Sequence, residues 1–288
     1  MSLDGSTVNV EDYPLLWIYE TYYNTYKGNT FVLPTNAGND IWAGDAIDYT
    51  GVNSIDLNGN SLTTNFSTTL MGKFKNIELL YLYDNSITFV DVTVLQKATV
   101  IAIYNNALTG NYDFTNNTLL TELNIRNNNI TGVDVSTCLV LDTFSCQNND
   151  LPTLDVTNNT ALTELQAFSN DLPSVDVSNN TLLTLLYLFS NDLTSIDLSN
   201  NVSLSTLYLF SNDLDDLDIS NNTLLTNLRI QNNELDNLVN SQILIDLDGH
   251  GLSNGYLQST IFGGGSLTTA GTTAKTNLQG KGWTIVGI

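Results

Sequence analysis

The sequence predicts a solenoid, a stack of short parallel β-strands with a turn-rich opposite side and little helix. Three observations lead to this prediction. An asparagine recurs at nearly constant spacing, apolar residues stand at fixed offsets around it, and a short run of Asp, Ser and Asn fills the rest of each unit. Self-similarity with a period of roughly 20–50 residues is the sequence signature of repeat architectures.

The first element of each unit is a strand that ends near the recurring asparagine. The steps between these asparagines are 25, 21 and 22 residues and then 21 residues five times. Apolar residues lie at offsets −8, −5, −3 and +2, which predicts a strand with the −5 and −3 side chains turned inward, because side chains alternate across a strand. The aligned asparagines are Asn60, Asn85, Asn106, Asn128, Asn149, Asn170, Asn191, Asn212 and Asn233.

The second element of each unit is a polar turn, as in "LDVTNN" and "IDLSNN". Short Asp, Ser and Asn side chains bond to their own backbone and favour turns over helix. A 21-residue unit leaves little room for a helix, and we expect Asn pairs such as Asn179 and Asn180 in the same turns. The aspartates of this column are Asp91, Asp113, Asp134, Asp155, Asp176, Asp197 and Asp218.

The combined pattern L-x-x-L-x-L-x-x-N-x-L is the leucine-rich repeat signature. Stretches such as "TLLTLLYLFSNDLTSIDLSNN" (181–201) resemble the leucine-rich repeats of bacterial surface proteins, of the Bacteroidetes and internalin-like types. They also resemble repeats in proteins of phages that infect such hosts. The resemblance covers about residues 52–252 and implies a leucine-rich repeat solenoid with its parallel sheet on the concave face. It implies no fixed chemistry, because this fold presents surfaces for binding.

Three segments are expected: residues 1–50, the array at 51–252, and a C-terminal cap at 253–288. The first segment either caps the array or serves attachment or oligomerisation, since terminal repeats need a polar outer face and large aromatic area can anchor an interface. Its candidate anchors are Trp17, Tyr19, Tyr22 and Tyr23.

The C-terminal cap is expected to contain a helix and a final strand. The stretch "TTAKTNLQG" (272–280) suits a short helix that ends at Gly280 or Gly282. Trp283, Ile285 and Val286 would then cover the last turn of the array. His250, the single histidine, aligns with the recurring asparagine in the last unit and is expected in a turn.

The residues at offsets −4 and −2 should face outward from the concave sheet. They predict a contiguous aromatic patch of Phe168, Tyr187, Phe189, Tyr208 and Phe210 and a second group of Tyr81, Tyr83 and Tyr104, with Arg126 between them. Exposed aromatic area usually marks an interaction site, here for a protein or a cell-surface glycan. Two alternatives stay open: the rings stabilise the sheet by stacking, or the heptapeptide "YLFSNDL" repeats because units were duplicated.

The charge balance excludes several functions. With 30 acidic and 8 basic residues, the net charge of −22 argues against nucleic-acid backbones and anionic membranes. No apolar run approaches the roughly 18 residues of a membrane span. The column Asp150, Asp171, Asp192 and Asp213 is either a solvated acidic edge or a weak Ca²⁺ site, since Ca²⁺ prefers carboxylate oxygens. No other cofactor is expected.

No enzyme is expected, because acidic residues recur in every unit and neither a Ser/His/Asp set nor a phosphate-binding loop is present. We expect a non-enzymatic binding or structural module, in particular a phage virion component such as a fibre, tail or receptor-binding protein. Its partners would be other virion proteins, a cell-surface molecule or a second copy. The alternatives are a bacterial surface adhesin domain and a purely structural assembly protein. The start "MSLDGSTVNV" has no secretory-signal pattern, so the expected location is a virion or an extracellular surface.

Overall fold

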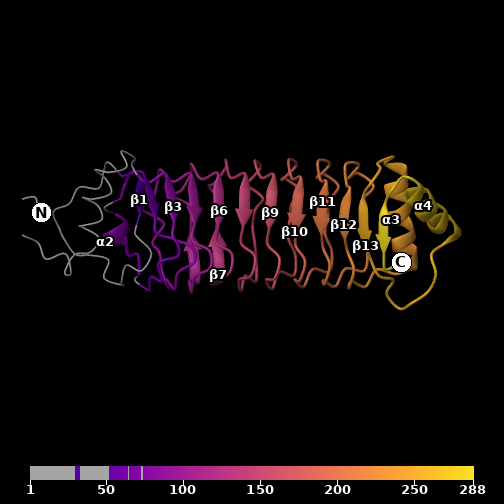
Figure 1. Ribbon diagram of the computed structural model, residues 1–288, viewed down its shortest axis with the longest axis horizontal. Helices are drawn as coiled ribbons and strands as arrows, with labels where there is room; N and C mark the ends of the chain where they lie inside the picture. Colours follow the sequence, from indigo (N-terminus) through magenta and orange to yellow (C-terminus); the bar gives the residue numbers. More distant parts are fainter. Residues whose placement is uncertain (1–29, 33–51, 64, 73) are drawn as a thin grey trace, which may run out of the picture.

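The computed structural model describes residues 30–32, 52–63, 65–72 and 74–288, and these residues form the predicted solenoid. Twelve strands of the described chain make one parallel sheet, with neighbouring strands side by side along the molecule (Figure 1). The sheet strands are β1 (Thr30–Val32), β2 (Ser54–Asp56), β3 (Leu79–Tyr81), β4 (Val100–Ala102), β6 (Glu122–Asn124), β8 (Thr143–Ser145), β9 (Glu164–Gln166), β10 (Leu185–Tyr187), β11 (Thr206–Tyr208), β12 (Asn227–Arg229), β13 (Tyr256–Gln258) and β14 (Thr284–Val286).

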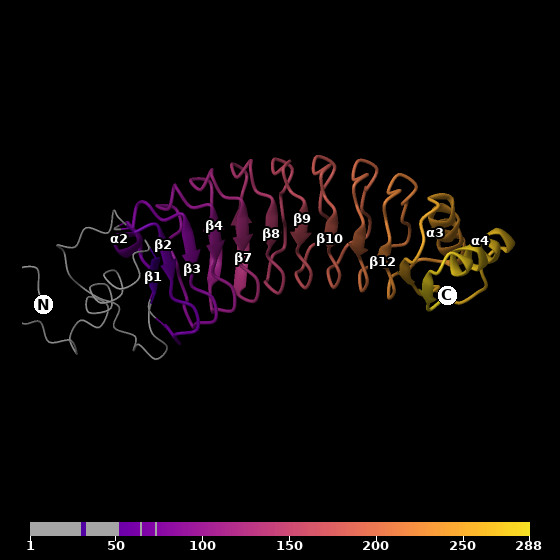
Figure 2. The same ribbon diagram turned by 45° about the horizontal axis from the view of Figure 1, so that its top comes forward.

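Outside this sheet, few of the described residues have regular secondary structure. The short helix α2 (Thr68–Met71) lies near the N-terminal end of the described array, and β5 (Thr109–Asp113) pairs with β7 (Asn129–Asp134) in a separate parallel sheet. Helices α3 (Asn237–Gly249) and α4 (Thr269–Gly280) pack on each other at the C-terminal end (Figure 2). The prediction of a turn-rich array with little helix is confirmed.

The strand register follows the sequence period. Leu186 pairs with Leu165 on one side and with Leu207 on the other, each 21 residues away. In the twelve-stranded sheet, the middle residue of every strand from β3 to β13 is fully buried, whereas the residues beside it are mostly half-buried. The leucines at −5 therefore form the core, as their alternation with polar residues predicted.

The two C-terminal turns are longer than the others. Leu228 pairs with Leu257 and Leu257 with Ile285, which gives units of 29 and 28 residues by difference in residue number. The extra residues form α3 and α4. The helix expected at 272–280 is the C-terminal part of α4, whereas α3 was not predicted.

Two expectations about the C-terminal unit need correction. His250 lies in a turn, as predicted, but as the C-cap residue of α3, where its backbone N–H donates to Asp246 O at 2.9 Å, so it does not occupy the asparagine place of a repeat. Trp283 is buried and its indole N–H donates to Leu252 O at 3.0 Å. Val286, however, remains 41% exposed and covers little of the last turn.

The recurring asparagines bind consecutive turns together. The Asn191 amide nitrogen donates to Leu188 O at 2.9 Å and to Ala167 O in the preceding turn at 3.1 Å. Its Oδ1 accepts from Leu172 N at 3.2 Å. Because each such side chain satisfies backbone groups that have no strand partner, the column is buried without orphaned peptide groups. The same three bonds occur at Asn128, Asn149, Asn170, Asn212 and Asn233.

The residue before each of these asparagines has left-handed backbone geometry. Its φ lies between 52° and 59° in eight consecutive turns. Asn and Asp adopt this region more readily than other non-glycine residues, because their short polar side chains bond locally. Serine takes the position in three adjacent turns. The eight residues are Asp84, Asn105, Asn127, Asn148, Ser169, Ser190, Ser211 and Asn232.

Replacing Ser190 by asparagine is therefore expected to stabilise the protein by about 0.5–1 kcal/mol, part of the cost of a left-handed non-glycine residue. Urea denaturation followed by circular dichroism measures the change. Ser195→Asn is the matched control, because Ser195 is exposed in the same turn and has no positive φ. Equal midpoints for the two variants would contradict the backbone explanation.

Candidate interaction face

The outward face of the twelve-stranded sheet, which was predicted to be the concave face, carries a ladder of stacked aromatic rings from three consecutive turns. Phe168 stacks on Phe189 and Phe189 on Phe210, with ring centroids 4.1 and 4.2 Å apart. Tyr187 stacks on Tyr208 at 4.4 Å beside them. The spacing of adjacent parallel strands, about 4.8 Å, is what brings equivalent rings to stacking distance. We call these five residues the central ladder.

Stacking decides which parts of the rings remain available. All five side chains of the central ladder are half-buried, and the middle ring of the phenylalanine row, Phe189, is stacked on both faces. The contacts contribute about 0.5–1.5 kcal/mol per pair, so the sheet gains stability from them. Ring edges, not ring faces, are therefore what the central ladder offers to a partner.

A second ladder lies nearer the N-terminal end of the described array. Tyr83 stacks on Tyr104 at 4.5 Å, and Tyr81 meets Tyr83 edge-on at 6.4 Å. The guanidinium carbon of Arg126 lies 3.7 Å from the centroid of the Tyr104 ring. Arg126 therefore ends this ladder as a cation–π partner, on the side nearer the central ladder.

A third stacked group contains two residues outside the predicted site. The guanidinium carbon of Arg229 lies 4.8 Å from the Tyr208 ring centroid and 5.1 Å from that of Tyr256. Arg229 could have been found from its −4 offset, one unit beyond Tyr208. Tyr256 could not, because the 29-residue unit breaks the alignment.

Between the second ladder and the central ladder, the face carries polar side chains, some of them buried. Asn124, Ser145 and Gln166 are register partners on β6, β8 and β9. Ser145 and Gln147 are each only 6% exposed. The Gln147 Oε1 atom is buried and receives no hydrogen bond.

The acidic column at offset +1 is exposed in all four turns that were considered for Ca²⁺, at Asp150, Asp171, Asp192 and Asp213. In the described part of the chain, no group of three or more His, Cys, Asp or Glu residues could hold a metal ion. The calcium prediction therefore gains no support, and the column is an exposed acidic edge. The anchors predicted at Trp17, Tyr19, Tyr22 and Tyr23 lie outside the described residues.

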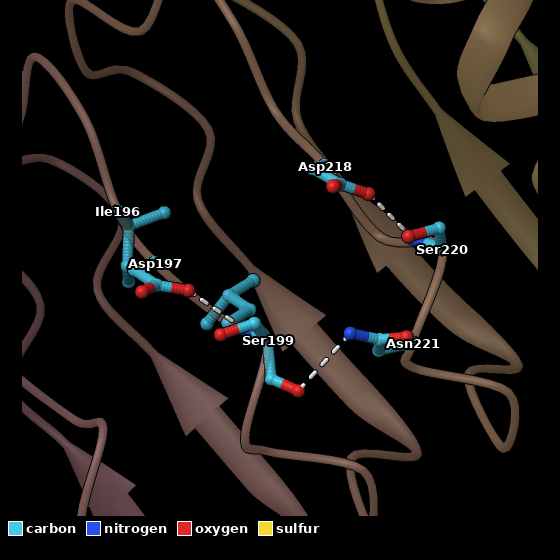
Figure 3. A pocket seen from close by; sticks show the side chains of 7 residues that line it. Ile196, Asp197, Ser199, Asp218, Ser220 and Asn221 are labelled. Carbon is cyan, nitrogen blue, oxygen red and sulfur yellow. Dashed lines mark hydrogen bonds between the residues drawn. The ribbon is translucent and has the colours of Figure 1, made fainter.

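The aspartates of the opposite side cap turns, as predicted. Asp197 Oδ1 accepts from Ser199 N and Asp218 Oδ1 from Ser220 N, each at 2.9 Å. Hydrogen bonds from the Ser199 side chain and backbone hold the pKa of Asp197 below its usual value, and bonds from the Ser220 backbone and side chain do the same for Asp218. A small hollow between the two turns is lined by these groups and by Asn221, which donates to Ser199 O at 3.3 Å (Figure 3). A general acid needs a raised pKa, so this carboxylate pair is unsuited to acid catalysis.

The second residue of each Asn pair is more than a turn former. Asn180 is fully buried, and its amide nitrogen donates to Val156 O at 2.9 Å and to Asn159 O at 2.8 Å. Its neighbour Asn179 is exposed and makes one such bond, to Thr157 O at 3.0 Å. The buried column consists of Asn117, Asn159, Asn180, Asn201 and Asn222, with Cys138 in one turn.

Both cysteine thiols should be unreactive in the folded protein. Burial, with smaller contributions from Asp134 and Asp113, raises the pKa of Cys138 to about 11, and burial raises the pKa of Cys146 as well. The thiolate is the reactive form, so at pH 8 iodoacetamide is expected to modify neither residue until denaturant is added. Mass spectrometry over time measures this. Rapid labelling of native Cys138 would contradict the buried position.

The comparisons with known proteins support the fold. No family model and no curated protein matches the chain. The functional domain of InlJ from Listeria monocytogenes is 30% identical, with a TM-score of 0.57 over 73% of this chain and 50% of that chain. The chain has a leucine-rich repeat fold. It spans half the length of the InlJ domain structure.

Two further structures agree with this fold. An internalin, InlF, from Listeria monocytogenes is 17% identical with a TM-score of 0.54, covering 96% of both chains. The leucine-rich repeat ectodomain of the receptor kinase GASSHO1/SCHENGEN3 from Arabidopsis thaliana, in complex with CASPARIAN STRIP INTEGRITY FACTOR 2, is 24% identical with a TM-score of 0.59. The match covers 72% of this chain and 28% of the ectodomain chain. Among the described residues, no helix is long and apolar enough to cross a membrane.

Proposed function

We propose that this protein is a non-enzymatic binding module that docks a protein partner on its concave face, with the central ladder in the middle of the contact. The observation that carries the proposal is the gathering of five half-buried rings from three adjacent turns outside the leucine core. Rigid aromatic side chains dominate the binding energy of many interfaces.

A protein partner fits this face better than a glycan. Sugar rings bind aromatic residues by lying flat on an open ring face. Inside the central ladder, the faces of Phe189 are taken by Phe168 and Phe210. Apolar side chains and peptide groups of a protein can pack on the ring edges that remain.

The setting we propose is a virion, as a fibre, tail or receptor-binding component, supported by the resemblance of the repeats to arrays in phage proteins. The second candidate is a bacterial cell-surface adhesin domain, supported by 30% identity to the InlJ domain over 73% of this chain. Both settings use the same concave face. A purely structural role would leave that face without a ligand.

The test is selection from a random 12-residue peptide display library, with a glycan array in parallel. The wild-type protein is expected to enrich peptides and to leave the array without signal. Phe189→Ser/Phe210→Ser should abolish the enrichment, because it removes two of the three stacked phenylalanines. Circular dichroism confirms that the variant is folded.

Leu182→Ser/Leu224→Ser is the matched control. These leucines are 52% and 53% exposed and lie outside the concave columns, so this variant removes two exposed apolar side chains elsewhere. It is expected to enrich the same peptides as the wild type. If the phenylalanine variant enriches them equally well, the central ladder is only packing and the proposal fails.

A further inference from the structure

Both arginines of the chain lie on the concave face, and neither has a carboxylate partner in the described part of the chain. The sequence has 30 acidic residues and only two arginines, Arg126 and Arg229. Each guanidinium instead lies over tyrosine rings, at 3.7 Å from Tyr104 or at 4.8 Å from Tyr208. The ion pair found among the described residues joins Lys281 and Asp248. The two guanidinium groups are therefore oriented but not neutralised.

Stacking prepares an arginine to bind an anion. A guanidinium that lies over a ring uses its face, so its N–H edge stays free for a planar acceptor. Carboxylates accept two parallel hydrogen bonds from such an edge. At Arg229 the Nε atom is buried and has no hydrogen-bond partner.

Unpartnered polar atoms on this face gather beside the two arginines. Gln147, 6% exposed and with an unbonded Oε1, follows β8 at offset −2, in the turn next to that of Arg126, which follows β6 at the same offset. Asn227 Oδ1, in β12 with Arg229, and Gln231 Oε1, two residues after that strand ends, are buried and unbonded. Buried polar groups normally have partners. Two polar subsites thus lie on either side of the central ladder, each with an arginine and at least one unused amide oxygen.

The spacing of the subsites suggests the form of the ligand. Arg126 follows β6 and Arg229 belongs to β12, five steps apart in the sheet order. At about 4.8 Å per step the separation is about 24 Å. An extended peptide rises about 3.3 Å per residue and covers that distance in about seven residues.

We propose that the concave face binds an extended peptide segment of its protein partner, with carboxylates about seven residues apart at Arg126 and Arg229. Apolar side chains between them pack on the ring edges of the central ladder. This inference rests on the proposed function. The net charge of −22 disfavours densely acidic ligands, which restricts carboxylates to the two arginine positions.

The experiment uses the 12-residue display library and synthetic peptides made from the enriched sequences. We expect enriched sequences to carry Asp or Glu at positions i and i+7 with apolar residues between. Arg126→Gln and Arg229→Gln should each weaken a selected peptide about 10- to 100-fold, the range for a charge-assisted bond. Changing the matching peptide Glu to Gln should then have no further effect. Titration calorimetry measures the four affinities of each double-mutant cycle, in which the wild-type protein and the arginine variant each bind the Glu and the Gln peptide.

Lys97→Gln is the control for charge alone. It removes one positive charge from an exposed side chain bonded to Asn76, outside the concave columns, and should leave affinity unchanged. Enriched peptides without the acid pair, or arginine variants that bind as well as the wild type, would overturn this inference. The proposed function would still stand if Phe189→Ser/Phe210→Ser lost binding. The absence of any enrichment would overturn both.

Discussion

Replacing Phe144 by alanine is expected to lower the free energy of unfolding by about 3–5 kcal/mol. Phe144 is the middle residue of β8 and one of the largest side chains that are fully buried. Its place in the core column is leucine in most turns, so this turn contains an unusually large ring. Because each turn of a solenoid contacts only its neighbours, few residues can move to fill the space that the ring leaves.

Urea denaturation followed by circular dichroism measures this loss. Phe262→Ala is the matched control, because it removes the same ring from a side chain that is 54% exposed. We expect the control to change stability by less than about 0.5 kcal/mol. Similar losses for both variants would show that Phe144 does not support the core.

The core could be predicted from the sequence because its pattern is local and repeats. Offsets −5 and −3 alternate with polar residues, and the same period sets the strand register, so Leu165, Leu186 and Leu207 pair as their spacing requires. The aromatic columns follow from the same register. Once the strands lie about 4.8 Å apart, equivalent rings must stack.

What could not be predicted depends on departures from the period. The 29-residue unit contains α3, and without its length the alignment placed His250 at an asparagine position and hid Tyr256 from the site. The pairing of Arg126 with Tyr104 was missed for a different reason. Offsets give the face on which a side chain lies, but not which neighbour it contacts.

The burial of the two asparagines in each pair could not be predicted either. Asn179 and Asn180 are the same residue type in the same turn, yet one is exposed and the other fully buried. Their composition predicts a turn for both. In the structure the two side chains point in different directions. Asn179 faces solvent, whereas the Asn180 amide donates to two buried carbonyls.

This difference predicts a large effect at Asn180. Asn180→Ala removes two buried hydrogen bonds, those to Val156 O and Asn159 O, and each carbonyl keeps only its backbone donor, Asn159 N or Leu162 N. A buried hydrogen bond contributes about 0.5–1.5 kcal/mol, so we expect the loss of two to cost about 1–3 kcal/mol. Cys138 shows what the column tolerates, because its thiol keeps weak contacts to Phe114 O and Asn117 O at 3.4 and 3.6 Å.

Asn179→Ala is the control within the same pair, because Asn179 is exposed and water can replace its single bond to Thr157 O. We expect a loss below about 1 kcal/mol. Asn180→Cys should fall between the two alanine variants, since a thiol is a weaker donor than an amide. The same order in urea midpoints would indicate that hydrogen bonds to carbonyls, and not turn propensity, retain asparagine at this position. Equal losses for Asn179→Ala and Asn180→Ala would instead point to the turn.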